Sequence, residues 1–333
     1  MIIQIKKDIN QKELQNLNQV LDDLNIDHYP VKTQKGHYQI CTPKSEFDIR
    51  GIGHLAGIID VHRVSGKHKM VSHNWKIDRS VIDIGDGIKI GDGHFEMMAG
   101  PCSIESEEQI ADTVECLKEN GVRIMRGGVY KPRTSPYSFR GLGIEGLKLF
   151  YKTCSENGIK IITEVMEAGQ IGDMMPYVDI FQVGARNAQN FNLLEALGEI
   201  DKPVLIKRGI SGSIDELLYS AEYIFKNGNE KIILCERGIR TFETSYRNTL
   251  DLNAVPILKQ KSHLPVIVDP SHGIGIRKHV YRMTLAAVAS GCDGILIEIH
   301  KTPNLAATDG QQTIDFKEFS RLVNNIEKMR PIL

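Results

Sequence analysis

Short apolar runs alternate with segments of helical spacing over most of the chain. From about residue 95 to the end, eight such runs recur, and each is followed by a segment whose apolar residues keep helical spacing. Because the runs are almost wholly apolar rather than alternating, they predict strands buried on both faces, as in a parallel sheet. The predicted strands are residues 95–99, 122–125, 160–163, 180–183, 204–206, 231–235, 265–268 and 294–297.

The segments between these strands carry helix start signals. Ser106-Glu-Glu-Gln109 matches a capping box, Ser213 and Glu216 open another helix, and a last helix is predicted over about 315–329. Eight strand–helix units in about 235 residues predict a (β/α)8 TIM barrel. A doubly wound sheet is disfavoured, because Gly-Pro-Cys-Ser follows the first strand where a G-x-G-x-x-G turn would be expected.

The first part of the chain has a different pattern. A strand, an amphipathic helix, a hairpin, a second helical stretch and a last strand follow one another, and this βαββαβ order is typical of a small α+β, ferredoxin-like domain. The strands are predicted at 2–5, 28–33, 37–41 and near 58–64, and the first helix at 11–24.

We therefore expect three parts. Residues 1–65 form a ferredoxin-like domain, residues 66–94 a connector, and residues 95–333 the (β/α)8 barrel. Within the connector, 81–84 and 88–90 flank Gly85-Asp86-Gly87 and predict a β-hairpin that closes the barrel bottom.

Composition and charge narrow the class of protein. Lys and Arg number 41 against 42 Asp and Glu, a net charge of −1, so the bulk charge gives no case for binding nucleic acid or a membrane surface. No apolar run approaches the ~18 residues of a spanning helix, and the first residues lack a signal-peptide core, so we expect a cytoplasmic protein. The six cysteines are irregularly spaced without a C-x-x-C pair, which disfavours a zinc ribbon or a disulfide framework and predicts that most are core residues.

Positive residues gather at the predicted carboxyl ends of the strands, the end that carries active sites in TIM barrels. Several cations at one end of a net-neutral protein predict a pocket for the phosphate and carboxylate groups of a small substrate, and solvated loop salt bridges are the competing interpretation. These residues are Arg126, Lys131, Arg133, Arg186, Lys207, Arg208 and Arg237.

A second group at the same end contains metal-ligand side chains. Cys102, His272, Glu298 and Asp309 follow strands one, seven and eight, which become neighbours when a barrel closes. A thiolate, an imidazole and two carboxylates suit a divalent transition metal with an open position, although each residue alone is ordinary core or loop material. Schiff-base chemistry at Lys207 or Lys131 is the alternative, and Glu164 is either a base or a partner of the cations.

At these residues the sequence resembles the 3-deoxy-D-arabino-heptulosonate 7-phosphate (DAHP) synthases, which catalyse the first step of the shikimate pathway. The N-terminal extension resembles the subgroup in which such a domain mediates feedback inhibition. The matching stretches are Ala99-Gly-Pro-Cys-Ser103, Arg126-Gly-Gly, Lys131-Pro-Arg-Thr-Ser135, Gln182-Val-Gly-Ala-Arg-Asn187, Leu205-Ile-Lys-Arg-Gly209, Cys235-Glu-Arg-Gly-Ile-Arg240, Val268-Asp-Pro-Ser-His272 and Asp309-Gly-x-Gln312.

The resemblance implies a metal-dependent condensation of phosphoenolpyruvate with erythrose 4-phosphate. The metal (Mn²⁺, Fe²⁺, Co²⁺ or Zn²⁺) would be held by Cys102, His272, Glu298 and Asp309, and Lys131 or a metal-bound water would move protons. Erythrose 4-phosphate would meet Arg133 and Thr134. The family pattern also implies a tyrosine or phenylalanine effector and a homo-oligomer, either a dimer or a tetramer. The residues expected to contact phosphoenolpyruvate are Arg126, Lys131, Glu164, Ala185, Arg186, Lys207 and Arg237.

Two alternatives stay open at this point. A 3-deoxy-D-manno-octulosonate 8-phosphate synthase shares the chemistry but takes arabinose 5-phosphate. Its members typically carry Lys-Ala-Asn-Arg-Ser where this chain has Lys131-Pro-Arg-Thr-Ser135, which favours the four-carbon aldose. The other alternative is a barrel that has become a non-catalytic sensor, and the unbroken ligand and cation sets argue against it.

Overall fold

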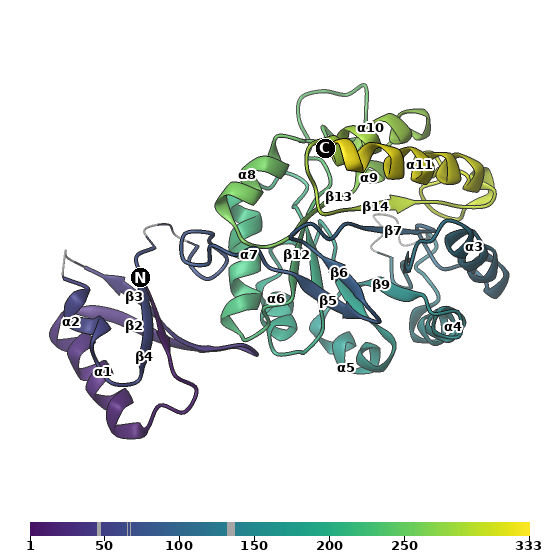
Figure 1. Cartoon of the computed structure of the whole chain (residues 1–333). Helices are drawn as coiled ribbons and strands as arrows, with labels where there is room; N and C mark the ends of the chain where they lie inside the picture. Colours follow the sequence, from purple (N-terminus) through teal and green to yellow (C-terminus); the bar gives the residue numbers. More distant parts are fainter. Residues whose placement is uncertain (45–47, 65, 67, 132–136) are drawn as a thin grey trace.

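Eight parallel strands close into a barrel, as the sequence pattern predicts (Figure 1). The computed structural model describes residues 1–44, 48–64, 66, 68–131 and 137–333. The barrel order is β10-β11-β12-β13-β14-β7-β8-β9, so the last strand pairs with the first. The strands are β7 (Glu96–Gly100), β8 (Ile124–Arg126), β9 (Lys160–Val165), β10 (Ile180–Val183), β11 (Val204–Lys207), β12 (Ile232–Glu236), β13 (Val266–Val268) and β14 (Gly294–Glu298).

A helix or helical segment follows each barrel strand and packs on the outside. The third of these is broken into short pieces, η1 (Ala168–Gln170), α5 (Ile171–Met174) and η2 (Met175–Tyr177), rather than one long helix. The others are α3 (Glu107–Glu119), α4 (Gly143–Ser155), α6 (Phe191–Gly198), α7 (Ile214–Lys226), α8 (Ala254–Lys261), α10 (Arg277–Ala289) and α11 (Phe316–Met329), with short additions α9 (Pro270–Ile274), η3 (Pro303–Leu305) and η4 (Arg330–Ile332).

One of the two predicted helix starts is only half realised. At α7, Ser213 and Glu216 exchange both bonds of a capping box. At α3, the Ser106 side chain accepts from the backbone N–H of Gln109, but the Gln109 side chain accepts from Glu105 one residue earlier. The N-cap prediction at Ser106 therefore holds, whereas the reciprocal bond does not form, because the preceding backbone N–H captures the glutamine.

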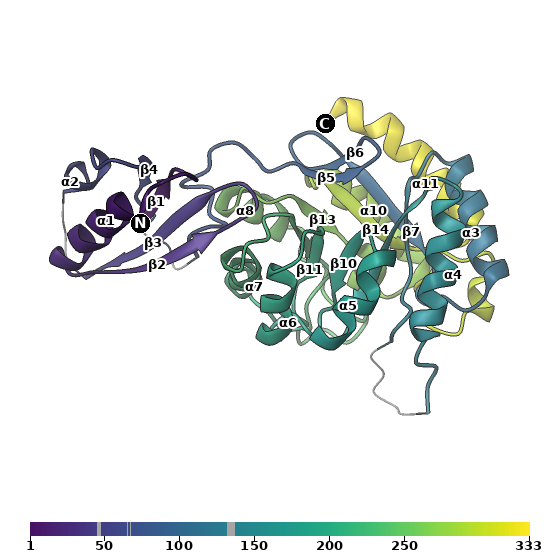
Figure 2. The same cartoon turned by 90° about the horizontal axis from the view of Figure 1, so that it is seen from below.

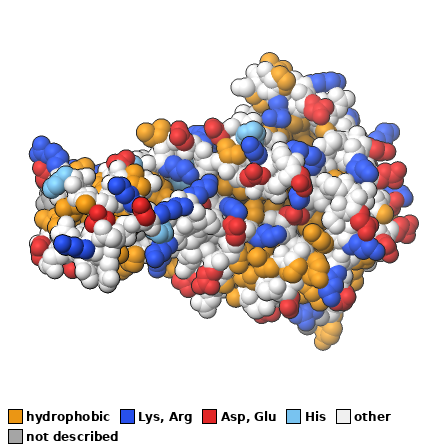
Figure 3. All heavy atoms as spheres, turned by 60° about the horizontal axis from the view of Figure 1, so that its bottom comes forward, with side chains coloured by type: hydrophobic (Ala, Val, Ile, Leu, Met, Phe, Trp, Pro, Cys, Tyr) orange, Lys and Arg blue, Asp and Glu red, His pale blue; other side chains and the backbone are white. Residues whose placement is uncertain are grey.

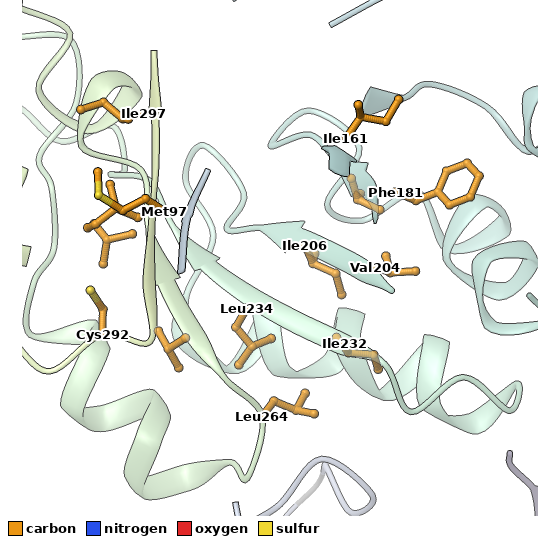
Figure 4. Close-up of a cluster of buried hydrophobic side chains, with 14 of the residues drawn as sticks. Met97, Ile161, Phe181, Val204, Ile206, Ile232, Leu234, Leu264, Cys292 and Ile297 are labelled. Atoms are coloured by element: carbon orange, nitrogen blue, oxygen red, sulfur yellow. The ribbon is translucent and has the colours of Figure 1, made fainter. Parts of the chain in front are cut away.

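The barrel has two apolar layers, as the period of two along a strand requires. On β11, Val204 and Ile206 join the layer between strands and helices, part of which Figure 4 shows. Leu205, between them, points into the barrel and packs with Met98 and Ile124. All six cysteines are buried, which confirms the prediction that most of them are core residues.

A β-hairpin fills the amino-terminal end of the barrel. It consists of β5 (Ile82–Gly85) and β6 (Ile88–Ile90), and its four isoleucines belong to the same buried cluster as the inward-facing barrel residues. Full burial of one such side chain stabilises a fold by roughly 1.5–3 kcal/mol. Positive φ angles at Asp86 and Gly87 give the tight turn that the Gly-Asp-Gly sequence predicts. The predicted closure of the barrel bottom is thus confirmed.

The N-terminal residues form the predicted ferredoxin-like sheet. Its order is β2-β3-β1-β4 and its pairs are antiparallel. The second helix is only one turn long. The elements are β1 (Ile2–Ile5), α1 (Gln11–Asp23), β2 (Ile26–Lys32), β3 (His37–Pro43), α2 (Arg50–Gly53) and β4 (Ile58–His62).

This small sheet lies to one side of the barrel in both views and contacts it through the β2–β3 turn (Figures 1 and 2). The backbone N–H of Gln34 donates to the Gly228 carbonyl at 3.2 Å, and the Thr33 hydroxyl donates to the Glu230 carboxylate. The domain boundaries at residues 65 and 94 stay predictions.

The surface carries no concentration of one charge on the face that Figure 3 displays, where Lys and Arg alternate with Asp and Glu. This mixture agrees with the net charge of −1. Among the helices of the described residues, none combines the length and the apolar character that crossing a membrane requires.

Candidate active site

A cavity of about 180 Å³ opens at the carboxyl ends of the barrel strands. Most of its wall is polar, and residues from seven of the eight strand ends or the loops after them line it. Its lining residues are Arg126, Lys131, Glu164, Gln182, Gly184, Ala185, Arg186, Lys207, Ile210, Arg237, Arg240, Arg247, Asn248, His272 and Asp309.

Two of the cavity's arginines are buried with donors left over. Arg126 is 4% exposed and Arg237 is 5% exposed. The Nη1 of Arg126 donates to the Pro101 carbonyl at 2.8 Å and to Glu298 Oε1 at 3.0 Å, while that of Arg237 donates to the Gly238 carbonyl at 3.1 Å. The Nε of each is buried without a partner among the described residues. A buried unpaired N–H is costly, so these donors point to an anionic ligand that completes them.

The two predicted lysines are each held by a residue from another strand end. Lys207 Nζ lies 2.6 Å from Asp269 Oδ2. Lys131 Nζ donates to the Cys102 carbonyl at 3.0 Å and to its Sγ at 3.1 Å. Arg186, in contrast, is exposed and lines the cavity, so its guanidinium is accessible to a ligand there.

Arg208, predicted as a member of the cationic group, does not line the cavity. Its Nη1 lies 2.9 Å from Glu236 Oε2 and 2.9 Å from Asp251 Oδ2. The reason is that Glu236 is fully buried and requires a cation beside it. The prediction that Arg208 belongs to the cationic cavity is therefore wrong. Arg208 forms salt bridges, as the competing interpretation expects, but these salt bridges are buried rather than solvated.

Three of the cavity residues that the sequence prediction missed come from one loop: Arg240, Arg247 and Asn248. They lie in the long loop between β12 and α8, four to twelve residues beyond the end of the strand at Glu236. The prediction considered only residues close to each strand end. A loop of this length with two further arginines was the available signal.

Glu164 sits against the end of β10 because Gly184 leaves room for it. A Cβ on Gly184 would lie 1.9 Å from Glu164 Oε1. Glu164 Oε2 accepts from Gln182 Nε2 at 3.4 Å, and Ala185 forms the neighbouring wall. The carboxylate therefore lines the same cavity as the cations, and its role as a base or as their partner stays a prediction.

The four predicted metal ligands meet beside the cavity. β7, β13 and β14 are neighbours in the barrel, as predicted. One donor atom each from Cys102, Glu298 and Asp309 lies within 4.8 Å of the other two. The His272 Nε2 lies 3.5 Å from Glu298 Oε1 and 3.9 Å from Asp309 Oδ2, and the Cys102 Sγ lies 3.3 Å from Asp309 Oδ2.

The chemistry of this donor set fits a divalent transition metal. Burial, together with the Glu298 charge, raises the pKa of the Cys102 thiol to about 12, and a coordinated cation is what stabilises a buried thiolate. The Nδ1 of His272 lies 2.8 Å from Asp269 Oδ2, which leaves Nε2 to face the other donors. Asp309 adopts a left-handed backbone with φ +52°, a strained conformation of the kind found at functional sites.

Neighbouring charges keep Asp269, the partner of His272 Nδ1, in its ionised form. Burial alone would raise the pKa of Asp269, but the adjacent His272 and Lys207 charges hold it well below its usual value. Asp269 is therefore an anion that orients His272. Arg133 and Thr134, expected to meet the second substrate, lie outside the described residues.

The chain is similar to known proteins over most of its length. A model of the DAHP synthetase I family matches residues 74–333. A phospho-2-dehydro-3-deoxyheptonate aldolase of Thermotoga maritima is 50% identical over 273 residues, 82% of this chain and 80% of the relative. A 2-dehydro-3-deoxyphosphooctonate aldolase of Syntrophobacter fumaroxidans is 30% identical over 259 residues, 72% of this chain and 88% of the relative.

Solved structures extend the similarity to the whole fold. The crystal structure of a DAHP synthase from Thermotoga maritima superposes with a TM-score of 0.79 and 42% identity, covering 99% of this chain and 97% of that one. A truncated form of the Thermotoga enzyme gives 0.76 and 47%, covering 80% and 98%. With a family model matched across the entire barrel and a relative at 50% identity, this chain belongs to the DAHP synthetase I family.

Proposed function

We propose that the chain condenses phosphoenolpyruvate with erythrose 4-phosphate to give DAHP and phosphate. The observation that carries the proposal is the meeting of two sets at one end of the barrel. Buried arginines with unpaired donors line a cavity, and a thiol, an imidazole and two carboxylates stand at its side. The first set suits a small phosphorylated acid, and the second suits a metal-assisted reaction of a carbonyl.

The cations bind and orient the phosphorylated acid. Arg126 and Arg237 bring buried guanidinium groups to the cavity wall, and Arg186 adds an exposed guanidinium. Charge-assisted bonds to a carboxylate or phosphate are among the strongest that a protein makes. Held in this way, the acid presents its C3 carbon in a fixed position, which lowers the entropic part of the barrier.

The reaction forms one carbon–carbon bond and one carbon–oxygen bond to water, and it breaks the carbon–oxygen bond to phosphate. C3 of phosphoenolpyruvate attacks the aldehyde carbon, water adds at C2, and phosphate leaves from C2. In this proposal Lys131, whose Nζ lies beside Cys102, donates a proton to the new alkoxide, and Glu164, which lines the same cavity, takes one from the attacking water. A divalent ion held by Cys102, His272, Glu298 and Asp309 would polarise the aldehyde as a Lewis acid.

The test compares two aldoses. The full chain is incubated with phosphoenolpyruvate, Mn²⁺ and either erythrose 4-phosphate or arabinose 5-phosphate, and phosphate release and product mass are measured. We expect the seven-carbon product, and no turnover after treatment with EDTA. An eight-carbon product would establish the octulosonate alternative, to which relatives at 30–33% identity belong. No product from either aldose would contradict the catalytic proposal.

The N-terminal sheet is proposed as the regulatory part. It contacts the barrel through Thr33 and Gln34, so a ligand bound to it can act on the barrel through this contact. We expect tyrosine or phenylalanine to inhibit the full chain and to leave a chain starting at residue 66 unaffected. Equal inhibition of both chains would exclude this sheet as the effector site. Light scattering of the full chain tests the proposed dimer or tetramer.

A further inference from the structure

A buried glutamine joins the proposed metal site to the arginine-lined cavity. Gln312 is fully buried in the loop that follows Asp309. Its Nε2 donates to Glu298 Oε2 at 2.6 Å, and its Oε1 accepts from Arg247 Nη1 at 2.6 Å. These are among the shortest side-chain contacts around the site, yet Gln312 itself neither lines the cavity nor offers an atom to the ligand group.

The chemistry of its two partners fixes the orientation of the Gln312 amide. A guanidinium can only donate and a carboxylate can only accept. The oxygen of Gln312 must therefore face Arg247, and its nitrogen must face Glu298. Rotating the amide by half a turn would set N–H against N–H and oxygen against oxygen, so Arg247 determines which group Glu298 meets.

This contact decides which oxygen Glu298 presents to the other ligands. Oε2 is taken by Gln312, while Oε1 lies 3.0 Å from Arg126 Nη1 and 3.5 Å from His272 Nε2. Arg126 touches only Oε1 among the two, so it leaves the carboxylate free to pivot about that atom. Gln312 supplies the second point of attachment, and two points fix the plane of a carboxylate.

We propose that Gln312 is a positioning residue for Glu298, and that Arg247 acts through it by holding its amide in one orientation. The inference rests on the proposed metal site. It adds two hydrogen bonds that connect Arg247 in the cavity wall, through Gln312, to the proposed ligand Glu298. Partners of this kind commonly change metal affinity by 10–100-fold when they are removed.

The direct test is a metal titration that does not depend on turnover. The full chain is freed of metal by chelation and titrated with Co²⁺, and the dissociation constant and the visible spectrum are recorded. Gln312→Met keeps the length of the side chain and removes both hydrogen bonds. We expect it to bind Co²⁺ 10–100-fold more weakly than the wild type and to alter the ligand-field bands.

A matched control comes from the same loop. Thr308 is buried, and its hydroxyl pairs with Ser103 rather than with a ligand side chain. Thr308→Val also removes one buried hydrogen bond, and we expect it to keep the wild-type affinity and spectrum. Loss of affinity by both variants alike would mean that the loop as a whole, not Gln312, matters, and would overturn the proposal.

A second variant keeps the test decisive if Gln312→Met folds poorly. The side chain of Arg247 is 34% exposed, so Arg247→Met is expected to fold. It should weaken Co²⁺ binding less than Gln312→Met, and the double variant should bind no more weakly than Gln312→Met alone. Because Arg247 Nη1 also lies 3.4 Å from Asp309 Oδ1, additive losses would show that Arg247 acts through Asp309 instead, and would overturn its proposed role.

The outcomes separate this inference from the proposed function. Wild-type protein that fails to bind Co²⁺ contradicts the metal site itself. Wild-type protein that binds Co²⁺, with a Gln312→Met variant that binds equally well and with the same spectrum, contradicts only the positioning role.

Discussion

The two ends of the barrel carry similar polar side chains but arrange them differently. At the amino-terminal end, Glu222 accepts the backbone N–H groups of Met70 at 2.8 Å and Val71 at 3.1 Å. At the carboxyl end, the buried Nε atoms of Arg126 and Arg237 have no partner among the described residues. One end uses its polar groups to hold segments of the chain together, and the other keeps donors available.

A single hydrogen-bonded chain illustrates the amino-terminal arrangement. Lys76 Nζ donates to Ser80 Oγ at 2.9 Å, Ser80 pairs with His263 Nδ1 at 2.8 Å, and His263 Nε2 pairs with the Met70 carbonyl at 2.8 Å. Lys76 can only donate, so Ser80 accepts from it and donates its own proton to His263 Nδ1. His263 is then neutral and donates from Nε2 to the Met70 carbonyl. Groups paired in this way stabilise the fold, whereas unpaired donors in a cavity indicate a ligand.

The largest effect is expected at a proposed metal ligand. Cys102→Ser replaces a soft thiolate with a hard hydroxyl, so bound metal should be lost and kcat/KM should fall at least about 10³-fold, beyond the 10–100-fold typical of supporting residues. Metal content and initial rates measure this. Cys116→Ser, a buried cysteine on α3 far from the cavity, is the control and should keep its metal. A fully active Cys102→Ser protein would refute the ligand assignment.

The exposed cation of the cavity is expected to act mainly on substrate binding. Arg186→Ala removes a charge-assisted bond worth roughly 1.5–3 kcal/mol, so kcat/KM for phosphoenolpyruvate should fall by about 10–150-fold. The fall should appear chiefly in KM. Arg282, an exposed arginine on α10, provides the control through Arg282→Ala. If both substitutions leave the KM unchanged, Arg186 does not contact the substrate.

Substituting one buried aspartate at each end of the barrel compares the two hydrogen-bonding arrangements directly. Asp269 pairs with His272 and Lys207, and Asp293 pairs with Lys259 at 2.8 Å and with the Val266 N–H at 2.8 Å. Asp269→Asn should weaken metal binding by about 10–100-fold, because His272 loses its anionic partner. Asp293→Asn should lower the unfolding midpoint but keep the metal affinity. Equal effects of the two variants on metal affinity would remove the distinction between the ends.

The smallest effect on the active site is expected from a pH dependence of stability at the amino-terminal end. Burial, with the nearby Lys76 charge, lowers the pKa of His263 to about 3, against 6.5 for an ordinary histidine. The unfolded chain therefore binds a proton first. Stability from this residue is complete above pH 6.5 and is lost toward pH 3, by about 1.4 kcal/mol per pH unit.

Urea unfolding between pH 6.5 and 4.5 measures this slope. His263→Gln keeps a donor and an acceptor but does not titrate, so its free energy of unfolding should fall less steeply with decreasing pH than that of the wild type. Metal affinity at constant pH should be the same in both proteins. Parallel slopes would show that His263 is not the group that titrates.

Periodicity and topology carry the sequence prediction a long way. The alternation along β11 and the apolar hairpin near Ile82 are visible as patterns, and barrel closure brings Cys102 to His272 and Glu298 without further information. What the pattern does not contain is side-chain pairing. The ion pairs of Arg208 and the amide orientation of Gln312 depend on distances between loops, which no spacing rule encodes.

The hairpin at the amino-terminal end of the barrel also indicates where the chain can be shortened without exposing the barrel core. A barrel cut at residue 95 would expose Met98, Ile124 and Leu205 to water, because the isoleucines of β5 and β6 cover them. The family model, in agreement, begins at residue 74, before the hairpin. The hairpin and the barrel therefore share one buried cluster, and we expect the ferredoxin-like sheet to be separable from them.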